Sequence, residues 1–209
     1  MADFNLYYPK LVKHEGGYAN DPKDTGGETY RGIARRYNPT WNGWVDIDAK
    51  KKSGPIKWNS VFPELESKVK PFYKKAYWDS IALDKLNNQS IAEFLADFKI
   101  NGMWKSDVNK IQSFVGAVPD GAIGRDTIEV INKYPDTGKL HDFIFKTRKE
   151  HYDRVVAVDP SQSKFYDGWT KRIKQFSYDN KGIVVAAGVG FFFWILLGVV
   201  AFIIYKKNK

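Results

Sequence analysis

Apolar side chains recur at helical spacing near the start of the chain. A first helix is predicted over residues 5–15. One stripe of side chains, spaced by three or four residues, consists of Phe4, Tyr8, Leu11, Val12 and Glu15. Asn5 is expected to cap this helix, and Pro9 is expected within its first turn, where a missing N–H costs little. Gly16 and Gly17 then end it. The stripe is apolar except for its last member, Glu15.

The next residues alternate between turn signals and short patterned pieces. Residues 18–32 contain Asp-Pro and Gly-Gly turns followed by the extended piece ETYRGI, which predicts a small hairpin lobe. Residues 33–38 are expected to start a helix that Pro39 stops. Residues 40–60 are expected to be loop-like, with three tryptophans among lysines.

Helical spacing dominates from there on. Helices are predicted over about 61–80 (broken at Pro71), 88–101, 105–117, 125–134, 140–156 and 163–178. The uncharged run GIVVAAGVGFFFWILLGVVAFIIY, from Gly182 to Tyr205, is long enough for a transmembrane helix. The expected fold class is therefore mainly α: a helical domain with a small hairpin lobe near residues 18–32, a helical C-terminal half and one C-terminal transmembrane helix.

Composition narrows the chemistry. The 209 residues include no cysteine, which excludes thiol catalysis and disulfides, and the three histidines form no metal-type pair. Aromatic residues make up 16% of the chain, which suits either sugar-stacking faces or an aromatic-rich core. The net charge of +9 suits an anionic polymer, either nucleic acid or cell wall. No nucleic-acid-binding motif is visible, so we expect no nucleic acid among the partners.

Glu15 is the strongest catalytic candidate. A carboxyl at a helix C-terminus on an apolar stripe faces the negative end of the helix dipole and loses solvent, and both effects raise its pKa. A glutamate that stays protonated is what general-acid cleavage of a glycosidic bond requires. The alternative is a carboxylate that caps the glycine turn by accepting backbone N–H bonds.

The loop after Glu15 offers a second carboxylate. Asp24 and Asp21 are both available, and one of them could orient a water or stabilise positive charge at the anomeric carbon. The hydroxyl of Thr29 can help to place that water. Asp-Pro and Asp-x-Gly are also ordinary turn formers, an interpretation that we favour for Asp21. The separation of the carboxyl groups, and with it retention or inversion, is left open.

The stretch LVKHEGGYANDPKDTGGETYRGI, which ends at Ile33, resembles the signature of the glycoside hydrolase 108 family, the N-acetylmuramidases of phages and bacteria. The segment FYKKAYWDSIALDKL (72–86) resembles the end of the family's lysozyme domain. The following segment resembles its companion peptidoglycan-binding domain, and PDGAIGRDT (119–127) matches a turn of that domain. This turn is either a helix-packing element or a glycan contact.

The resemblance implies a lysozyme-type peptidoglycan hydrolase that cleaves the β-1,4 bond between N-acetylmuramic acid and N-acetylglucosamine. It implies Glu15 as the general acid, with Asp24 and Thr29 completing a triad. Tyr18, Tyr30 and Arg31 are expected to bind substrate, the rings by stacking on sugars and Arg31 by reaching an anionic group. No cofactor or metal is expected, and the protein is expected to be a monomer.

The expected domains are a lysozyme-like catalytic domain over 1–88, a peptidoglycan-binding helical domain over 89–178 and a transmembrane helix over 182–205. The N-terminus shows no secretory signal. The expected localisation is a single-pass protein of the inner membrane of a bacterium or phage-infected host, acting on the periplasmic wall in phage lysis or wall remodelling. The alternative function is a non-catalytic, membrane-anchored protein that binds peptidoglycan or assists secretion.

Overall fold

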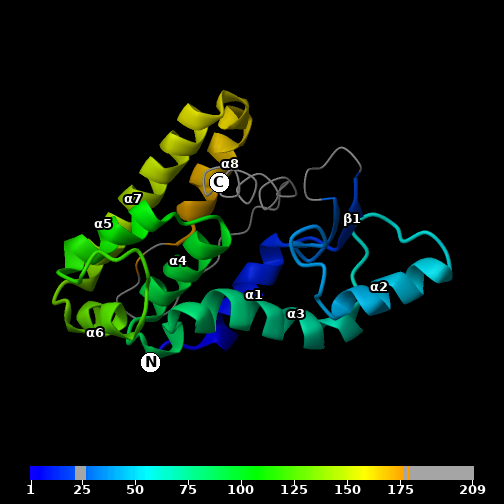
Figure 1. The fold of residues 1–209 in the computed structure, drawn as a ribbon, viewed down its shortest axis with the longest axis horizontal. Helices are drawn as coiled ribbons and strands as arrows, with labels where there is room; N and C mark the ends of the chain where they lie inside the picture. Colours follow the sequence, from blue (N-terminus) through cyan, green and yellow to red (C-terminus); the bar gives the residue numbers. More distant parts are fainter. Residues whose placement is uncertain (22–26, 177, 179–209) are drawn as a thin grey trace. The chain divides into compact units, whose positions relative to one another are not determined.

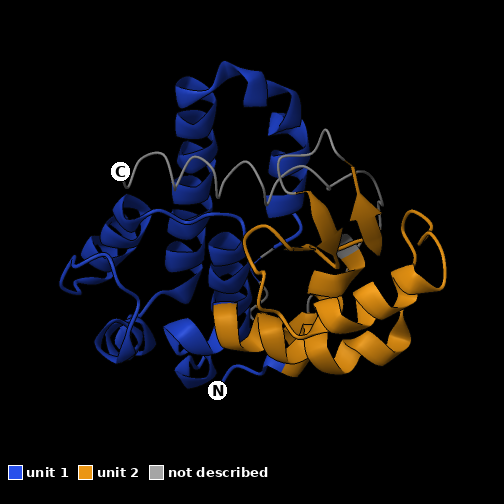
Figure 2. Cartoon of the chain, turned by 45° about the vertical axis from the view of Figure 1, so that its right-hand side comes forward, with its two compact units in different colours: residues 1–4, 77–189 blue, residues 5–76, 190–209 orange. Residues whose placement is uncertain are grey.

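The computed structural model describes residues 1–21, 27–176 and 178. The chain forms two compact units, shown in separate colours in Figure 2. Of the described residues, one unit contains residues 5–76, and the other combines residues 1–4 with residues from 77 onward. The expected division between residues 88 and 89 stays a prediction.

Residues 5–76 form most of a first helix, a small sheet and two further helices (Figure 1). Their bounds are α1 Phe4–His14, β1 Tyr18–Asn20, β2 Glu28–Tyr30, β3 Ile33–Ala34, α2 Gly43–Lys52, the 3₁₀ turn η1 Pro63–Leu65 and α3 Glu66–Tyr73. The sheet is antiparallel in the order β1-β2-β3. The lobe predicted over residues 18–32 is thus a three-stranded sheet that continues to Ala34.

A two-residue turn joins β2 to β3. Tyr30 pairs with Ile33, and the two residues between them, Arg31 and Gly32, have φ of 48° and 74°. Positive φ at both central residues matches the right-handed twist of the flanking strands. The residues predicted as the start of a helix from 33 therefore continue the sheet, because pairing with β2 outweighs local helix preference.

Two other local predictions are wrong. α1 begins at Phe4, so Asn5 is not its cap, and Pro9 lies inside the helix rather than in its first turn. α2 occupies part of the 40–60 segment predicted as loop. Its apolar residues form no broad stripe, since Trp44 and Ile47 are buried whereas Val45 between them is 71% exposed.

Aromatic rings form the core between the sheet and its helices. Tyr30 is fully buried and stacks against Trp41 on one side, at 6.2 Å between ring centroids, and Phe62 on the other, at 5.7 Å. Trp41 also packs edge-on against Trp44 at 5.1 Å. In this unit, the aromatic richness of the sequence therefore serves core packing.

The unit that combines residues 1–4 with residues from 77 onward is helical throughout its described part. Its elements are the π-helical turn η2 Lys74–Trp78, which begins in the other unit, the 3₁₀ turns η3 Asp79–Ile81 and η4 Leu83–Lys85, the helices α4 Gln89–Ile100, α5 Lys105–Val115, α6 Arg125–Lys133 and α7 Thr137–Val158, the 3₁₀ turn η5 Pro160–Phe165 and α8 Tyr166–Ile173. The long helix α7 packs against α4, α5 and α8, as Figure 1 shows. α4 is buried on nearly all sides, so it is the central helix of this unit.

An ionic cluster lies inside the helical unit. Asp97 of α4 accepts hydrogen bonds from Arg172 at 3.0 Å and contacts Arg148 at 2.5 Å. Burial opposes the ionisation of Asp97, but the two guanidinium groups outweigh that effect and hold its pKa below the usual value. Breaking one partner of such a pair leaves an uncompensated buried charge, so the cluster fixes α4, α7 and α8 together.

The PDGAIGRDT turn is held from within the fold. The side chain of Gln112 donates to Asp120, to the carbonyl oxygen of Ala122 and to Thr127, and accepts from the backbone N–H of Gly121. These bonds satisfy a buried amide completely. Their number favours the helix-packing interpretation of this turn.

The expected membrane helix is corrected. In the parts of the chain that the structure describes, no helix is long and apolar enough to cross a bilayer. The predicted span over 182–205 lies outside those parts. The described fold is mainly helical with a small sheet, and the transmembrane helix and the membrane-anchored localisation are both withdrawn.

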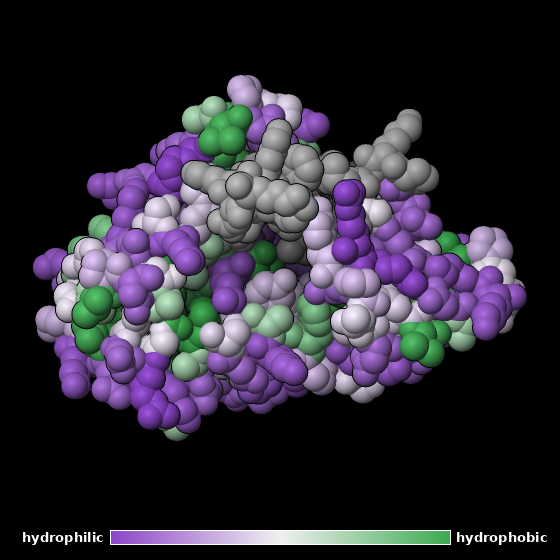
Figure 3. Space-filling view, in the orientation of Figure 1, coloured by the Kyte–Doolittle hydropathy of each residue, from purple (hydrophilic) through white to green (hydrophobic). Residues whose placement is uncertain are grey.

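The surface drawn in Figure 3 is largely hydrophilic, with hydrophobic residues in small separate groups. Large apolar side chains that remain exposed among the described residues are Met1, Leu6, Val45, Trp58, Val61, Val118 and Val158. Scattered apolar side chains are normal on protein surfaces. Trp58 and Val61 differ from the others because they share one loop beside the small sheet.

Candidate active site

Glu15 directly follows the last residue of α1. It is only 9% exposed, and the apolar face of the helix before it is also buried, including Tyr7 and Leu11. The structure therefore places this carboxyl where the sequence pattern puts it, at the C-terminal end of a helix and on its buried side.

The β2–β3 turn lies against the carboxyl group of Glu15. A Cβ atom built on Gly32 would be 2.2 Å from Oε2 of Glu15 and 2.7 Å from the hydroxyl oxygen of Tyr73. That hydroxyl donates a hydrogen bond of 2.7 Å to the carbonyl oxygen of Arg31. The acid, the turn and α3 are thus in close contact around one glycine.

Arg31 connects the same three elements through its guanidinium group. Nη1 donates to the backbone carbonyl oxygen of Glu15 at 3.2 Å, while Nε and Nη2 contact Oε1 of Glu66 on α3 at 3.2 and 3.1 Å. The other carboxyl oxygen of Glu66 accepts from the hydroxyl of Tyr8 at 2.5 Å. Burial, and then the bond to Glu66, raise the pKa of Tyr8 above its usual value. Arg31 therefore fixes the backbone that carries the candidate acid.

Thr29 lies in the middle of β2. It pairs with Ala19 of β1 and Ala34 of β3, and it is 5% exposed. Its hydroxyl has no hydrogen-bond partner among the described residues. A buried hydroxyl in that state keeps both its donor and its acceptor capacity for a water or a substrate group.

Asp24 belongs to residues 22–26, which lie outside the described part of the chain. Asp21, directly before that segment, is exposed. The predicted second carboxylate therefore stays a prediction.

Tyr18 and Tyr30 were expected to stack on sugars, and the structure buries both. Tyr30 exposes no surface, and its hydroxyl exchanges hydrogen bonds with the backbone of Phe62. Tyr18 is 5% exposed and donates to Glu28 at 2.7 Å. Burial and this bond raise the pKa of Tyr18 to about 12. In the structure both rings pack in the core and hold the sheet, and their stacking on sugars stays a prediction.

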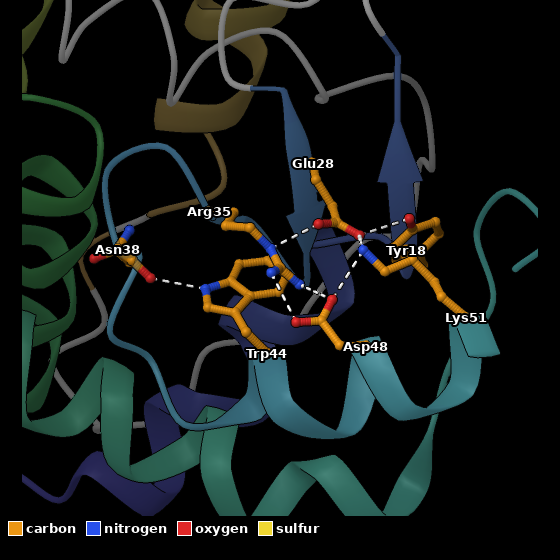
Figure 4. Close-up of polar contacts among 7 residues, drawn as sticks. All are labelled: Tyr18, Glu28, Arg35, Asn38, Trp44, Asp48 and Lys51. Carbon is orange, nitrogen blue, oxygen red and sulfur yellow. Dashed lines mark hydrogen bonds and ion pairs between the residues drawn. The ribbon is translucent and has the colours of Figure 1, made fainter.

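A polar network that the sequence pattern did not reveal connects the sheet to α2 (Figure 4). The carboxylate of Glu28 on β2 accepts a hydrogen bond from Tyr18 and forms ion pairs with Arg35 at 2.6 Å and Lys51 at 2.8 Å. Arg35 also donates two hydrogen bonds to Asp48, at 2.7 and 2.9 Å. Arg35 also lies 4.5 Å above the ring of Trp44, whose indole N–H donates to the carbonyl oxygen of Asn38. The only sequence signal was a run of lysines and acids four or fewer residues apart on α2.

No group of three or more His, Cys, Asp or Glu side chains suited to holding a metal ion occurs within residues 1–21, 27–176 and 178. The polar groups near Glu15 are Arg31, which donates to its backbone carbonyl oxygen, and the hydroxyl of Tyr73, which donates to the carbonyl oxygen of Arg31.

Comparisons with known proteins indicate the class of protein. The family model described as Glycosyl hydrolase 108 matches residues 8–102, and the model described as Predicted Peptidoglycan domain matches residues 108–174. The two matches define a glycoside hydrolase that acts on peptidoglycan. Residues 8–102 of the chain belong to the glycosyl hydrolase 108 family.

One solved structure, described as the structure of Brucella abortus SagA, is similar in fold. It has 24% sequence identity and a TM-score of 0.57, and the similarity covers 83% of this chain and 90% of that one. No curated protein is significantly similar to the chain.

Proposed function

We propose that the protein is an N-acetylmuramidase that cleaves the β-1,4 bond between N-acetylmuramic acid and N-acetylglucosamine, with Glu15 as the general acid. The observation that carries the proposal is the burial of Glu15 at the C-terminal end of α1 within the matched hydrolase segment. A carboxyl group in such a position holds its proton more readily than one in water. The site of action is the cell wall.

In the proposed reaction, Glu15 donates its proton to the glycosidic oxygen as the bond from that oxygen to the anomeric carbon breaks. A water adds its hydroxyl to the anomeric carbon, and its remaining proton passes to a carboxylate, so one water is consumed per bond. Thr29 is proposed to place the water, which its unpartnered hydroxyl supports. Asp24 is proposed to orient that water or to stabilise the oxocarbenium-like transition state.

Arg31 has a different proposed role from the one that the sequence resemblance implies. Its guanidinium group is engaged by Glu66 and by the backbone of Glu15, so we propose that it positions the acid rather than reaching an anionic substrate group. The two roles separate kinetically, since positioning acts on kcat and substrate binding acts on KM.

The direct test is Glu15→Gln in the full chain, assayed by release of reducing ends from purified peptidoglycan. Loss of a general acid typically costs about 10²- to 10⁴-fold, so activity should fall by that order with the circular dichroism spectrum unchanged. Glu129→Gln, an exposed residue of α6, is the matched control and should keep wild-type turnover. Wild-type rates in Glu15→Gln would remove Glu15 from the mechanism.

Asp24→Asn is expected to lose activity strongly but less than Glu15→Gln. The amide keeps hydrogen bonding but cannot carry the negative charge that stabilises a cationic transition state. Near-wild-type turnover in this variant would leave Asp24 as a turn residue only.

A further inference from the structure

The loop between α2 and η1, residues 53–62, is fastened to the chain just after Glu15. The backbone N–H of Tyr18 donates to the carbonyl oxygen of Ser60 at 2.8 Å, and that of Asn59 donates to the carbonyl oxygen of Tyr18 at the same distance. The side chain of Asn59 also accepts from the N–H of Gly17 at 2.7 Å. In Figure 1 this cyan segment turns back after α2 toward β1.

The contact at Gly17 is close enough to require glycine. A Cβ atom there would be 2.3 Å from the carbonyl oxygen of Ser60 and 2.4 Å from that of Asn59. Because Gly17 is two positions after Glu15, the α-carbons of these residues are at most about 7.6 Å apart, two steps of 3.8 Å. The loop is thus held near the candidate acid by two backbone hydrogen bonds and by one hydrogen bond to the side chain of Asn59.

A pocket of about 490 Å³ lies on this loop. Its lining combines two lysines, two serines and apolar side chains, and consists of Lys50, Ser53, Gly54, Pro55, Ile56, Lys57, Ser60 and Phe62. The volume lies within the range of small-ligand sites, which combine apolar walls with a few polar groups. No acidic residue is among the lining, so the pocket favours an anionic ligand group.

Of the two lysines, Lys50 has a carboxylate partner and Lys57 has none among the described residues. Lys50 contacts Glu64 at 2.5 Å and lies 4.4 Å from the centroid of the Phe62 ring. Lys57 is exposed and makes no ion pair with any other described residue. Trp58, beside it, is 58% exposed, an unusual position for a large flat ring. Lys57 therefore offers charge, and Trp58 offers a stacking surface.

We propose that the loop 53–62 is a substrate subsite for peptide-substituted N-acetylmuramic acid, in which Lys57 binds a carboxylate of the stem peptide and Trp58 stacks on the glycan. The inference rests on the proposed function, because it assumes that the adjacent Glu15 acts on peptidoglycan. Peptidoglycan differs from other β-1,4-linked amino-sugar polymers in its carboxylate-bearing peptides, so a lysine on the loop fastened just after the acid provides selectivity for it.

The test compares two substrates, peptidoglycan with its stem peptides and glycan strands from which an amidase has removed them. For Lys57→Met, KM on the peptide-bearing substrate should rise about tenfold, the lower end of the value of a hydrogen bond to a charged group. KM on stripped strands and kcat on both should stay unchanged. Lys52→Met removes an exposed lysine of α2 that does not line the pocket, and it should match wild type on both substrates.

Trp58→Ala should raise KM on both substrates, because the sugar ring is present in both. Equal effects of Lys57→Met on the two substrates, or no effect on either, would overturn the proposal that Lys57 binds a carboxylate of the stem peptide. An unchanged KM for Trp58→Ala would overturn the stacking role.

Binding separates this inference from the proposed reaction. In Glu15→Gln, calorimetric titration with N-acetylmuramyl dipeptide should give weaker binding after Lys57→Met is added, and no change after Lys52→Met. If the wild-type protein releases no reducing ends but this difference persists, the proposed function fails and the subsite stands. If hydrolysis occurs and the difference is absent, the subsite fails alone.

Discussion

Gly32 and Glu15 are in such close contact that a single added carbon on Gly32 would be 2.2 Å from the carboxyl oxygen Oε2 of Glu15. The first residue belongs to a turn between two strands, and the second follows a helix. Their contact joins the small sheet to the candidate acid, and it explains why the turn requires glycine for reasons of space as well as of backbone conformation.

Gly32→Ala should therefore abolish most activity. The new methyl group must displace the carboxyl group of Glu15, and a shift of about 1 Å at a catalytic group can cost about 100-fold in rate. Gly116→Ala is the matched control, because Gly116 also has positive φ, at 83°, but a Cβ there meets nothing within 4 Å.

Both variants should lose about 1 kcal/mol of unfolding free energy from the left-handed backbone, measured in urea. Only Gly32→Ala should also lose peptidoglycan hydrolysis. Equal activity in the two variants would show that the turn does not control the carboxyl position.

Arg31→Lys tests the positioning role of the guanidinium group. Lysine keeps the charge but cannot contact Glu66 through two nitrogens and the backbone of Glu15 through a third. We expect kcat to fall about tenfold, the effect of losing one hydrogen bond to a charged group, with KM nearly unchanged. A rise in KM at constant kcat would instead support direct contact with substrate.

The sequence predicted the helices after residue 61 and the buried position of Glu15 at the end of α1. The spacing of Phe4, Leu11 and Glu15 placed the acid on the buried side of its helix, because a helical stripe depends only on local periodicity. Burial of Tyr18 and Tyr30 was not predictable in this way. Their environment comes from rings far along the chain, such as Phe62, and strand alternation does not say which face is covered.

The contacts of Glu28 were also beyond the sequence pattern. They join β1, β2 and α2. α2 itself was missed because Val45 is apolar but exposed, so the apolar residues of this helix do not follow its buried side. Tertiary contacts, and not the propensities of the isolated segments, determine both the Glu28 network and the helix α2.

Glu28→Gln should lower stability and, through β2, activity. Removing the charge leaves Arg35 and Lys51 without one of their partners in a half-buried setting, so we expect a loss of about 2 kcal/mol in urea unfolding. Asp48→Asn serves as control because its carboxyl group is largely exposed, and it should lose less stability than Glu28→Gln. A larger loss for Asp48→Asn than for Glu28→Gln would contradict this ranking.

Stability should fall as the pH falls below about 6.5, the ordinary pKa of histidine. Burial lowers the pKa of both His141 and His151, and for His151 it outweighs the opposing effect of Asp107. Both imidazoles therefore bind a proton more readily in the unfolded chain than in the folded protein. The stabilising contribution is complete above the unfolded pKa and is lost as the pH falls through the lowered folded values.

Each histidine can contribute up to about 1.4 kcal/mol per pH unit within that window. Urea unfolding between pH 8 and pH 5 should show a flat free energy down to about pH 7 and a decline below it. His141→Gln should make the decline shallower, since one of the two titrating groups is removed. A profile that stays flat to pH 5, where the carboxyl groups are still ionised, would show that both imidazoles protonate freely inside the fold.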